Sequence, residues 1–223
     1  MATELTEGVW RFKLRGVNAY LVFDDVPTLV DAGTPLDESR IRAELGEIGM
    51  APEDIGRVLL THYDLDHVGT LGALAPELEA TVHAGRYDAE ILTGARSPPI
   101  TNHKGAFQRL VGLFTSPPAL DVEPIDDGET VGSFTAYHTP GHTPGHVAYV
   151  SADLDVALLG DLVAGADGAL DPSGWAMSYD TDRVRESIDD LAERAPAFAV
   201  ACMGHGTPLT SGGSDALAAL ARR

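Results

Sequence analysis

The sequence predicts an α/β fold with four layers, in which two β-sheets pack face to face and helices cover both outer faces (αββα). Short apolar runs typical of strands come first, at 9–14, 18–23 and 28–31. Strand and helix patterns then alternate, and a second run of strands after residue 121 is followed by helices. Two strand-rich regions, each accompanied by helices, favour two sheets that each have a helical cover.

Apolar residues at helical spacing indicate the helices. Asp37 is placed to cap a helix that runs to about Ile48, in which Ile41 and Leu45 recur at this spacing. Further helices are predicted from about 68 to 74 and at 87–92, 181–194 and 214–220. Further strands are predicted at 58–60, 81–83, 147–150, 156–159 and 198–202.

Two Ser-Pro-Pro sequences bracket a segment in the middle of the chain, at 97–99 and 116–118. Between them, Phe107, Leu110, Val111 and Phe114 fall on one face of a helix. We therefore expect a single domain over 1–223 with an inserted, lid-like segment at about 95–120, because long insertions in compact domains are often functional. A dimer contact, and hence a homodimer, or a plain core helix are the alternatives.

Length and composition indicate a globular protein. The chain has 223 residues, of which 44% are hydrophobic, and no apolar run approaches the roughly 20 residues of a membrane span. Its first residues lack the basic start and apolar run of a signal peptide, so we expect a cytoplasmic protein. Cys202 is the only cysteine, which excludes an internal disulfide.

The charge is strongly negative, with 34 acidic and 15 basic residues and a net charge of −19. Only Lys13 and Lys104 are lysines. This balance is typical of proteins from salt-accumulating halophiles, and an ordinary acidic cytosolic protein is the alternative. It argues against nucleic-acid or anionic-membrane partners, which need basic patches.

Four metal-capable side chains lie within six residues, in the sequence His62-Tyr63-Asp64-Leu65-Asp66-His67. The stretch follows a predicted strand directly, and a loop at a strand end can turn imidazoles and carboxylates toward one ion. The alternative is an exposed turn or a helix N-terminus capped by Asp64 or Asp66.

Three later segments repeat this arrangement. His142 and His146 lie in a loop rich in glycine and proline at 139–146, Asp161 ends an apolar strand after Gly160, and His205 follows the strand at 198–202. Each places a metal-capable side chain at the end of a buried strand, which favours a shared metal site.

These motifs together resemble those of the metallo-β-lactamase superfamily. The resemblance covers about residues 8 to 222 and rests on five ordered segments: Asp31-Ala32-Gly33, His62 to His67, Gly141-His142, Gly160-Asp161 and Gly204-His205-Gly206. The sequence of residues 139–146 is most similar to that of glyoxalase II-like and lactonase-like hydrolases. The resemblance implies the αββα fold and a centre of two metal ions.

The resemblance also implies which residues bind each ion. The first site would use His62, Asp64 and His142, and the second would use Asp66, His67 and His205. Asp161 would bridge the two ions, and Asp31 would orient the site from behind the ligands.

Asp64 departs from the family, which has a histidine at this position. A carboxylate is a harder ligand and shifts preference from zinc toward iron or manganese. Flavodiiron proteins are similar, with a glutamate there and iron in the site. We expect two zinc ions, with iron or manganese as alternatives. A further alternative is that the first site binds its metal weakly or is empty.

The other histidines have weaker signals. His83 and His138 are expected to be structural, and His146 is equally suited to supporting a ligand or to packing. His103 and Lys104 lie in the insertion, where they either meet an anionic substrate or, as is commoner for such residues, belong to a solvated loop.

The motifs predict a metal-dependent hydrolase in which a metal-bound hydroxide attacks an ester, thioester, lactone or phosphoester of a small-molecule substrate. Asp66 or Asp161 would carry the proton to the leaving group. The alternatives are an iron-dependent oxidoreductase of the same fold, similar to sulfur dioxygenases, and a non-catalytic module stabilised by metal. A nuclease of this fold is disfavoured by the net charge.

Overall fold

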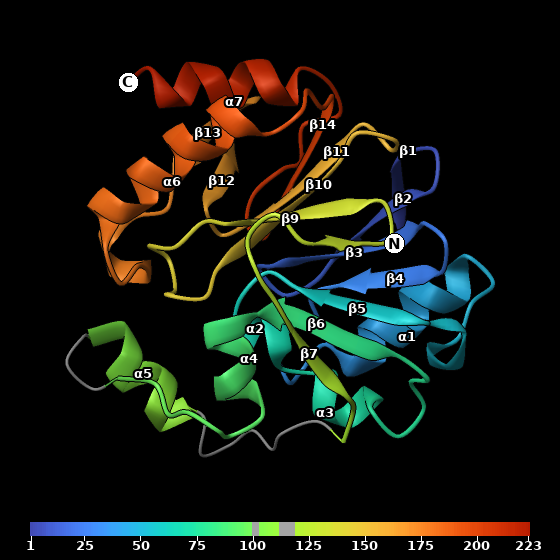
Figure 1. Ribbon diagram of the computed structural model, residues 1–223. Coiled ribbons are helices and arrows are strands. Elements are labelled where there is room, and N and C mark those ends of the chain that lie inside the picture. The colour runs from blue at the N-terminus through green and yellow to red at the C-terminus, as the bar shows by residue number, and fades with distance from the viewer. Residues whose placement is uncertain (100–102, 112–118) are drawn as a thin grey trace.

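The computed structural model describes residues 1–99, 103–111 and 119–223 of the chain, and within these residues the strands form two large sheets and a small ribbon (Figure 1). The first sheet contains β1 (Thr3–Thr6), β2 (Val9–Lys13), β3 (Asn18–Phe23), β4 (Pro27–Val30), β5 (Arg57–Leu60), β6 (Thr81–Gly85) and β7 (Val122–Ile125). The second contains β8 (Thr130–Val131), β9 (Phe134–His138), β10 (Val147–Ser151), β11 (Val156–Gly160) and β14 (Val200–Met203). The ribbon pairs β12 (Val163–Ala166) with β13 (Ala169–Pro172).

The helices follow the connections between these strands. They are α1 (Glu38–Glu47), α2 (Leu65–Val68), α3 (Leu71–Leu74), α4 (Arg86–Leu92), α5 (His103–Val111), α6 (Thr181–Arg194) and α7 (Gly213–Ala221), with 3-10 turns at Pro52–Asp54 and Trp175–Met177. Strands β1 to β4 are antiparallel and joined by short turns, whereas β4 to β7 are parallel and joined through helices. In the second sheet, α6 connects β11 to the parallel strand β14.

Three clusters of buried side chains separate the layers. The central cluster joins residues of both sheets, including Tyr20 and Leu59 from the first and Tyr149 and Leu158 from the second. The other two clusters lie on the outer faces, one against α1 and α3 and the other against α6 and α7. The predicted four-layer αββα sandwich is therefore confirmed.

The predicted helices are found with small differences. Asp37 is the residue before α1, but its carboxylate accepts hydrogen bonds from Thr34 and does not cap the helix. The helix expected to run to about residue 74 is instead two short ones, α2 and α3. The break has a clear cause, because the amides of Gly69 and Thr70 donate to the carbonyls of Gly33 and Ala32.

The inserted segment contains α5 (Figure 1). The predicted apolar face cannot be followed, since the side chains of Phe107, Leu110 and Val111 and the whole of Phe114 lie outside the described residues, as does 116–118. The role of this segment as a lid stays a prediction. In the part of the chain that is described, no helix is long and apolar enough to span a membrane.

Candidate metal centre

The predicted donors meet at one edge of the sandwich. The parallel pairs β4–β5 and β11–β14 bring the carboxyl ends of four strands to this edge, two from each sheet. Asp31 follows β4, His62 follows β5, Asp161 follows β11 and His205 follows β14. The loop between β9 and β10 adds His142.

Tight backbone geometry lets the two sheets meet there. Asp31 has a positive φ of 57°, a conformation rare for residues other than glycine. Gly160 has a φ of 51°, and a Cβ atom at this position would lie 2.6 Å from Cβ of Thr61. Only glycine allows the end of β11 to approach the end of β5 so closely.

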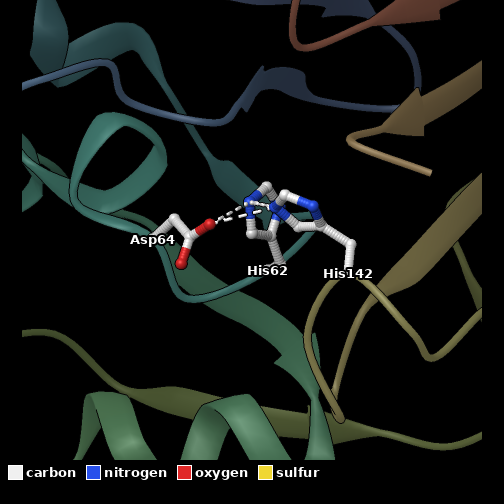
Figure 2. A group of neighbouring side chains, drawn as sticks. All are labelled: His62, Asp64 and His142. Carbon is white, nitrogen blue, oxygen red and sulfur yellow. Dashed lines mark hydrogen bonds and ion pairs between the residues drawn. The ribbon is translucent and has the colours of Figure 1, made fainter. Parts of the chain in front are cut away.

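His62, Asp64 and His142 form the first group of donors. Figure 2 shows their side chains pointing toward one another. The Nε2 atoms of His62 and His142 lie 3.1 Å apart, and Oδ2 of Asp64 lies 3.2 Å from the former and 3.0 Å from the latter. Donors bound to one metal ion at about 2.0–2.2 Å lie about 3–3.5 Å apart, so this triangle has the size of a metal site.

Asp66, His67 and His205 form the second group, and their ligand atoms all lie within 4.8 Å of one another. Nε2 of His205 lies 3.3 Å from Oδ2 of Asp66. Asp161 lies between the groups, with its Oδ2 3.1 Å from Nε2 of His205 and 3.4 Å from Nε2 of His142. The resemblance assigns it the bridging place, and the geometry suits that assignment.

Hydrogen bonds fix the tautomer of each histidine in the second group. Nδ1 of His67 donates to Oδ2 of Asp31 at 2.8 Å, and Nδ1 of His205 donates to the carbonyl of Gly16 at 2.8 Å. A neutral imidazole that donates from Nδ1 keeps a lone pair on Nε2. Both Nε2 lone pairs therefore face the centre.

The first group is oriented in the same way. The Thr61 hydroxyl donates to Asp31, so Nδ1 of His62, 2.9 Å from this hydroxyl, must donate to it. Nδ1 of His142 lies 2.9 Å from Oγ of Ser173. The contact of His62 leaves its Nε2 lone pair for the centre. The Ser173 hydroxyl can donate or accept, and where it accepts from Nδ1 of His142, the Nε2 lone pair of this ring also faces the centre.

The carboxylates and imidazoles of the centre shift one another's pKa values. Burial alone would raise the pKa of Asp161, but His67 and His142 outweigh it and hold this pKa well below its usual value. Burial opposes a charge on His67, yet Asp161 and Asp31 hold its pKa well above its usual value. The carboxylates of Asp161 and Asp66, whose oxygens lie 3.1 Å and 3.3 Å from Nε2 of His205, raise the pKa of this ring to about 10. The second group thus favours a positive charge, which a proton or a metal ion can supply.

The second group fits a metal ion. In the described part of the chain, five buried side-chain atoms have no hydrogen-bond partner, and three of them are Nε2 of His67, Nε2 of His205 and Oδ1 of Asp161. Buried polar atoms without partners are rare in folded proteins. Two imidazole nitrogens and a carboxylate oxygen that face one point are donors suited to Zn²⁺, Fe²⁺ or Mn²⁺.

Comparison with known proteins identifies the family. A model of the Metallo-beta-lactamase superfamily matches residues 13–205. The chain belongs to this superfamily. Most members of the metallo-beta-lactamase superfamily are metal-dependent hydrolases, and the αββα fold described above is theirs.

Two relatives in Bacillus subtilis (strain 168) are similar to this member of the superfamily. The uncharacterized protein YobT is 31% identical over 210 residues, which are 87% of this chain and 85% of YobT. The probable metallo-hydrolase YqjP is 35% identical over 74 residues, which are 32% of this chain and 23% of YqjP. Among solved structures, TTHA1623 in a di-iron-bound form is 28% identical with a TM-score of 0.67, and the match covers 91% of this chain and 96% of that one.

Other histidines of this metallo-beta-lactamase superfamily member lie outside the two groups. His146 is fully buried, and its Nε2 accepts a hydrogen bond from the backbone amide of Asp161 at 3.1 Å. It therefore holds the backbone of a donor residue in place. His83 lies near Glu123, and His138 contacts the carbonyl of Pro144. His103 stacks on the ring of Trp175, with ring centroids 4.8 Å apart.

Sequence patterns gave the wrong environment for Lys104. It is not in a solvated loop but in α5, and it is only 6% exposed. Its Nζ lies 2.7 Å from Oδ2 of Asp64 and 2.7 Å from Nε2 of His142. Gln108, one helical turn further on, was not predicted at all and contacts Asp64 as well. The spacing of Lys104 and Gln108 by four residues was the available signal, because it puts both on one face of a helix.

Proposed function

We propose that this protein is a metal-dependent hydrolase that acts on a small molecule with an ester, thioester, lactone or phosphoester bond. One observation carries the proposal: the Nε2 lone pairs of four histidines face one another among three carboxylates, and neighbouring groups fix each ring. Such a set of oriented donors is costly to bury without a function, and it matches the chemistry that hydrolytic metal centres use.

Asp66, His67, His205 and Asp161 would hold the principal metal ion. When bound, the metal supplies Lewis acidity, which polarises a carbonyl or phosphoryl oxygen of the substrate and makes water more acidic. The chain itself orients the donors, through Asp31 on His67 and through the Gly16 carbonyl on His205. The amide of Asp161 is held by His146, which fixes the carboxylate between the two groups.

Asp66 is the best-placed residue to move a proton. Its side chain is 30% exposed, as is that of His205 at 33%, whereas Asp161 is only 6% exposed. The centre therefore opens toward solvent on the side of Asp66 and His205. A carboxylate at this edge can pass a proton between the reacting centre and the leaving group or bulk water.

The test is reconstitution of metal-free protein with zinc, iron(II) or manganese, followed by assays on thioesters, esters, lactones and phosphodiesters in buffers of high salt. We expect one metal and one substrate class to give turnover. His205→Ala should lose both the bound metal and the activity, while His138→Ala should keep both, since His138 is exposed and its Nε2 contacts the carbonyl of Pro144 and not a donor of the centre. A protein that binds none of the three metals would contradict the proposal.

An iron-dependent oxidoreductase is the second candidate, because TTHA1623, which is similar over most of its length, was solved in a di-iron-bound form. The carboxylate of Asp64 in place of an imidazole also favours a harder metal. Iron retained through purification, together with consumption of dioxygen in the presence of a thiol substrate, would favour this candidate over the hydrolase.

A further inference from the structure

Lys104 reaches the first group of donors from the inserted segment. Its Nζ lies 2.7 Å from Oδ2 of Asp64, 2.7 Å from Nε2 of His142 and 2.7 Å from the carbonyl of Met177. The side chain is almost fully buried, so the ammonium is held in the protein and not in solvent. A positive charge of the chain itself therefore stands beside two of the three donors of the first group.

Helix α5 engages both oxygens of the Asp64 carboxylate. Lys104 contacts Oδ2, and Nε2 of Gln108 donates to Oδ1 at 2.5 Å and to the carbonyl of Tyr63 at 2.8 Å. The hydroxyl of Tyr179 donates to Oε1 of Gln108, which fixes the amide. Asp64 thus contacts α5 in addition to the two histidines of the first group.

The lone pair of His142 is the decisive point. Nδ1 of this ring lies 2.9 Å from Oγ of Ser173, and Nε2 lies 2.7 Å from the Lys104 ammonium. An ammonium can only donate, so Nε2 accepts with its single lone pair. That lone pair can accept a hydrogen bond from the ammonium or bind a metal ion, but it cannot do both. An ammonium has no lone pair of its own to offer a metal, and its charge repels one.

The second group differs in this respect. In the second group, Nε2 of His67 and Nε2 of His205 lie 3.5 Å and 3.1 Å from oxygens of Asp161, and among the described residues neither nitrogen forms a hydrogen bond. In the first group, Asp64 and His142 each lie 2.7 Å from the Lys104 ammonium. The first group therefore already contacts a cation of the chain, whereas the second group has donor atoms that are still unsatisfied.

We propose that the Lys104 ammonium occupies the first cation position of this centre, paired with Asp64, and that the chain binds a single metal ion, at Asp66, His67, His205 and Asp161. This rests on the proposed function only in requiring that the second group binds metal. It differs from the two ions that the family resemblance implies. This explains why residue 64 is an aspartate and not the histidine of the family, since a neutral imidazole could not form an ion pair with the ammonium.

The experiment is a titration of the metal-free full-length protein with Co²⁺ and, separately, with Zn²⁺, followed by gel filtration and elemental analysis. We expect the wild type to retain one metal per chain, and Lys104→Met to retain a second one. Lys13→Met is the matched control, because it removes the only other lysine, on the exposed end of β2, with the same change of net charge. This control should retain one.

Thermal unfolding gives a second readout that does not depend on activity. Lys104→Met leaves the Asp64 carboxylate buried without its ammonium partner, so the metal-free variant should melt lower than the wild type. A metal ion that binds only the folded state raises the melting temperature, and we expect a larger rise for Lys104→Met than for the wild type when the metal is increased beyond one equivalent. Asp64→His should also gain a second metal, since it removes the carboxylate that holds the ammonium.

The outcomes separate the two proposals. A wild type that binds two ions of similar affinity overturns the role of Lys104 and leaves the hydrolase intact. The role of Lys104 is also overturned if the wild type, Lys104→Met and Asp64→His each bind one metal ion per chain. The first group would then not be a cation site. A wild type without any metal refutes the metal-dependent function itself.

Discussion

The carboxylate of Asp31 accepts a hydrogen bond from Nδ1 of His67 over 2.8 Å, and it also accepts from the backbone amide and the hydroxyl of Thr61. One buried aspartate therefore orients His67 directly and His62 through Thr61. Its positive φ turns the side chain toward both motif loops. Asp31 thus links the two donor groups without belonging to either.

Replacing Asp31 with Asn should weaken metal binding about 10- to 100-fold, the usual cost of losing a group that orients a ligand. Asn tolerates the positive φ, but its amide nitrogen must face either Thr61 or His67, and both sides need an acceptor. Competition with a coloured chelator at constant pH measures the change. Equal affinities in a variant that folds normally would show that Asp31 has no such role.

Gly204→Ala should impair the metal centre without removing any donor. A Cβ atom here would lie 2.1 Å from Oδ1 of Asp161 and 2.6 Å from Cε1 of His67, so these donors must move. We expect a loss of bound metal in elemental analysis. Gly46→Ala is the control, because a Cβ atom at Gly46, in the exposed part of α1, meets no atom within 4 Å.

This control should itself be informative. An alanine in place of a helical glycine stabilises a protein by about 0.5–1 kcal/mol, so Gly46→Ala should melt slightly higher and keep its metal. If Gly204→Ala retained metal as well as Gly46→Ala does, the close packing of β14 against the centre would not matter for binding.

Asp88 should make the stability of the metal-free protein depend on pH. Burial raises its pKa, although hydrogen bonds from the Tyr63 amide and the Thr143 hydroxyl oppose the shift. A pKa raised on folding favours the protonated form in the native state. The stability from this group is therefore present at pH values below the usual aspartate pKa of about 3.9 and is lost as pH rises through the native value.

Asp88→Asn should remove this dependence. Its free energy of unfolding relative to the wild type should increase as pH rises from about 4 toward 7, since Asn cannot ionise. Urea unfolding of metal-free protein at several pH values measures it, with the exposed Asp153→Asn as the control. A difference that does not change with pH, or that changes in the opposite direction, would contradict the buried, raised pKa.

The net charge of −19 predicts that salt stabilises the fold. Repulsion among surface carboxylates weakens when ions screen it, so the melting temperature should rise between low salt and molar KCl. The same comparison near pH 4.5, close to the isoelectric point, is the internal control, because little net charge remains to screen. A melting temperature independent of salt at pH 7 would exclude charge repulsion as a major term.

Much of the fold follows from local patterns. The strands at β3 and β10 and the helix α6 lie where alternation and helical spacing predict them. The ribbon of β12 and β13 escaped prediction because its residues include small and glycine positions with a weak strand pattern. The break between α2 and α3 was also missed, since it depends on carbonyls of Gly33 and Ala32 that are distant in the sequence.

The sequence by itself determined the set of metal-capable residues and their order, because a donor that directly follows a buried strand is a local feature. It also determined the αββα class. Only the tertiary structure decided which donors meet, since Asp161 and His142 reach the second sheet's edge from different loops. It also decided the tautomers of His67 and His205, because their partners, the carboxylate of Asp31 and the carbonyl of Gly16, lie far along the chain.

The same holds for Lys104. The helical pattern around it predicts a helix between prolines, but a lysine in such a segment is ordinarily exposed, and no neighbour in the chain indicates a buried carboxylate partner. Its contact with Asp64 exists because α5 contacts the loop that follows β5, which brings together residues 40 positions apart in the sequence. Burial and charge pairing at such a distance are properties of packing, and therefore the identity of the cation at the first position could be read only from the folded chain.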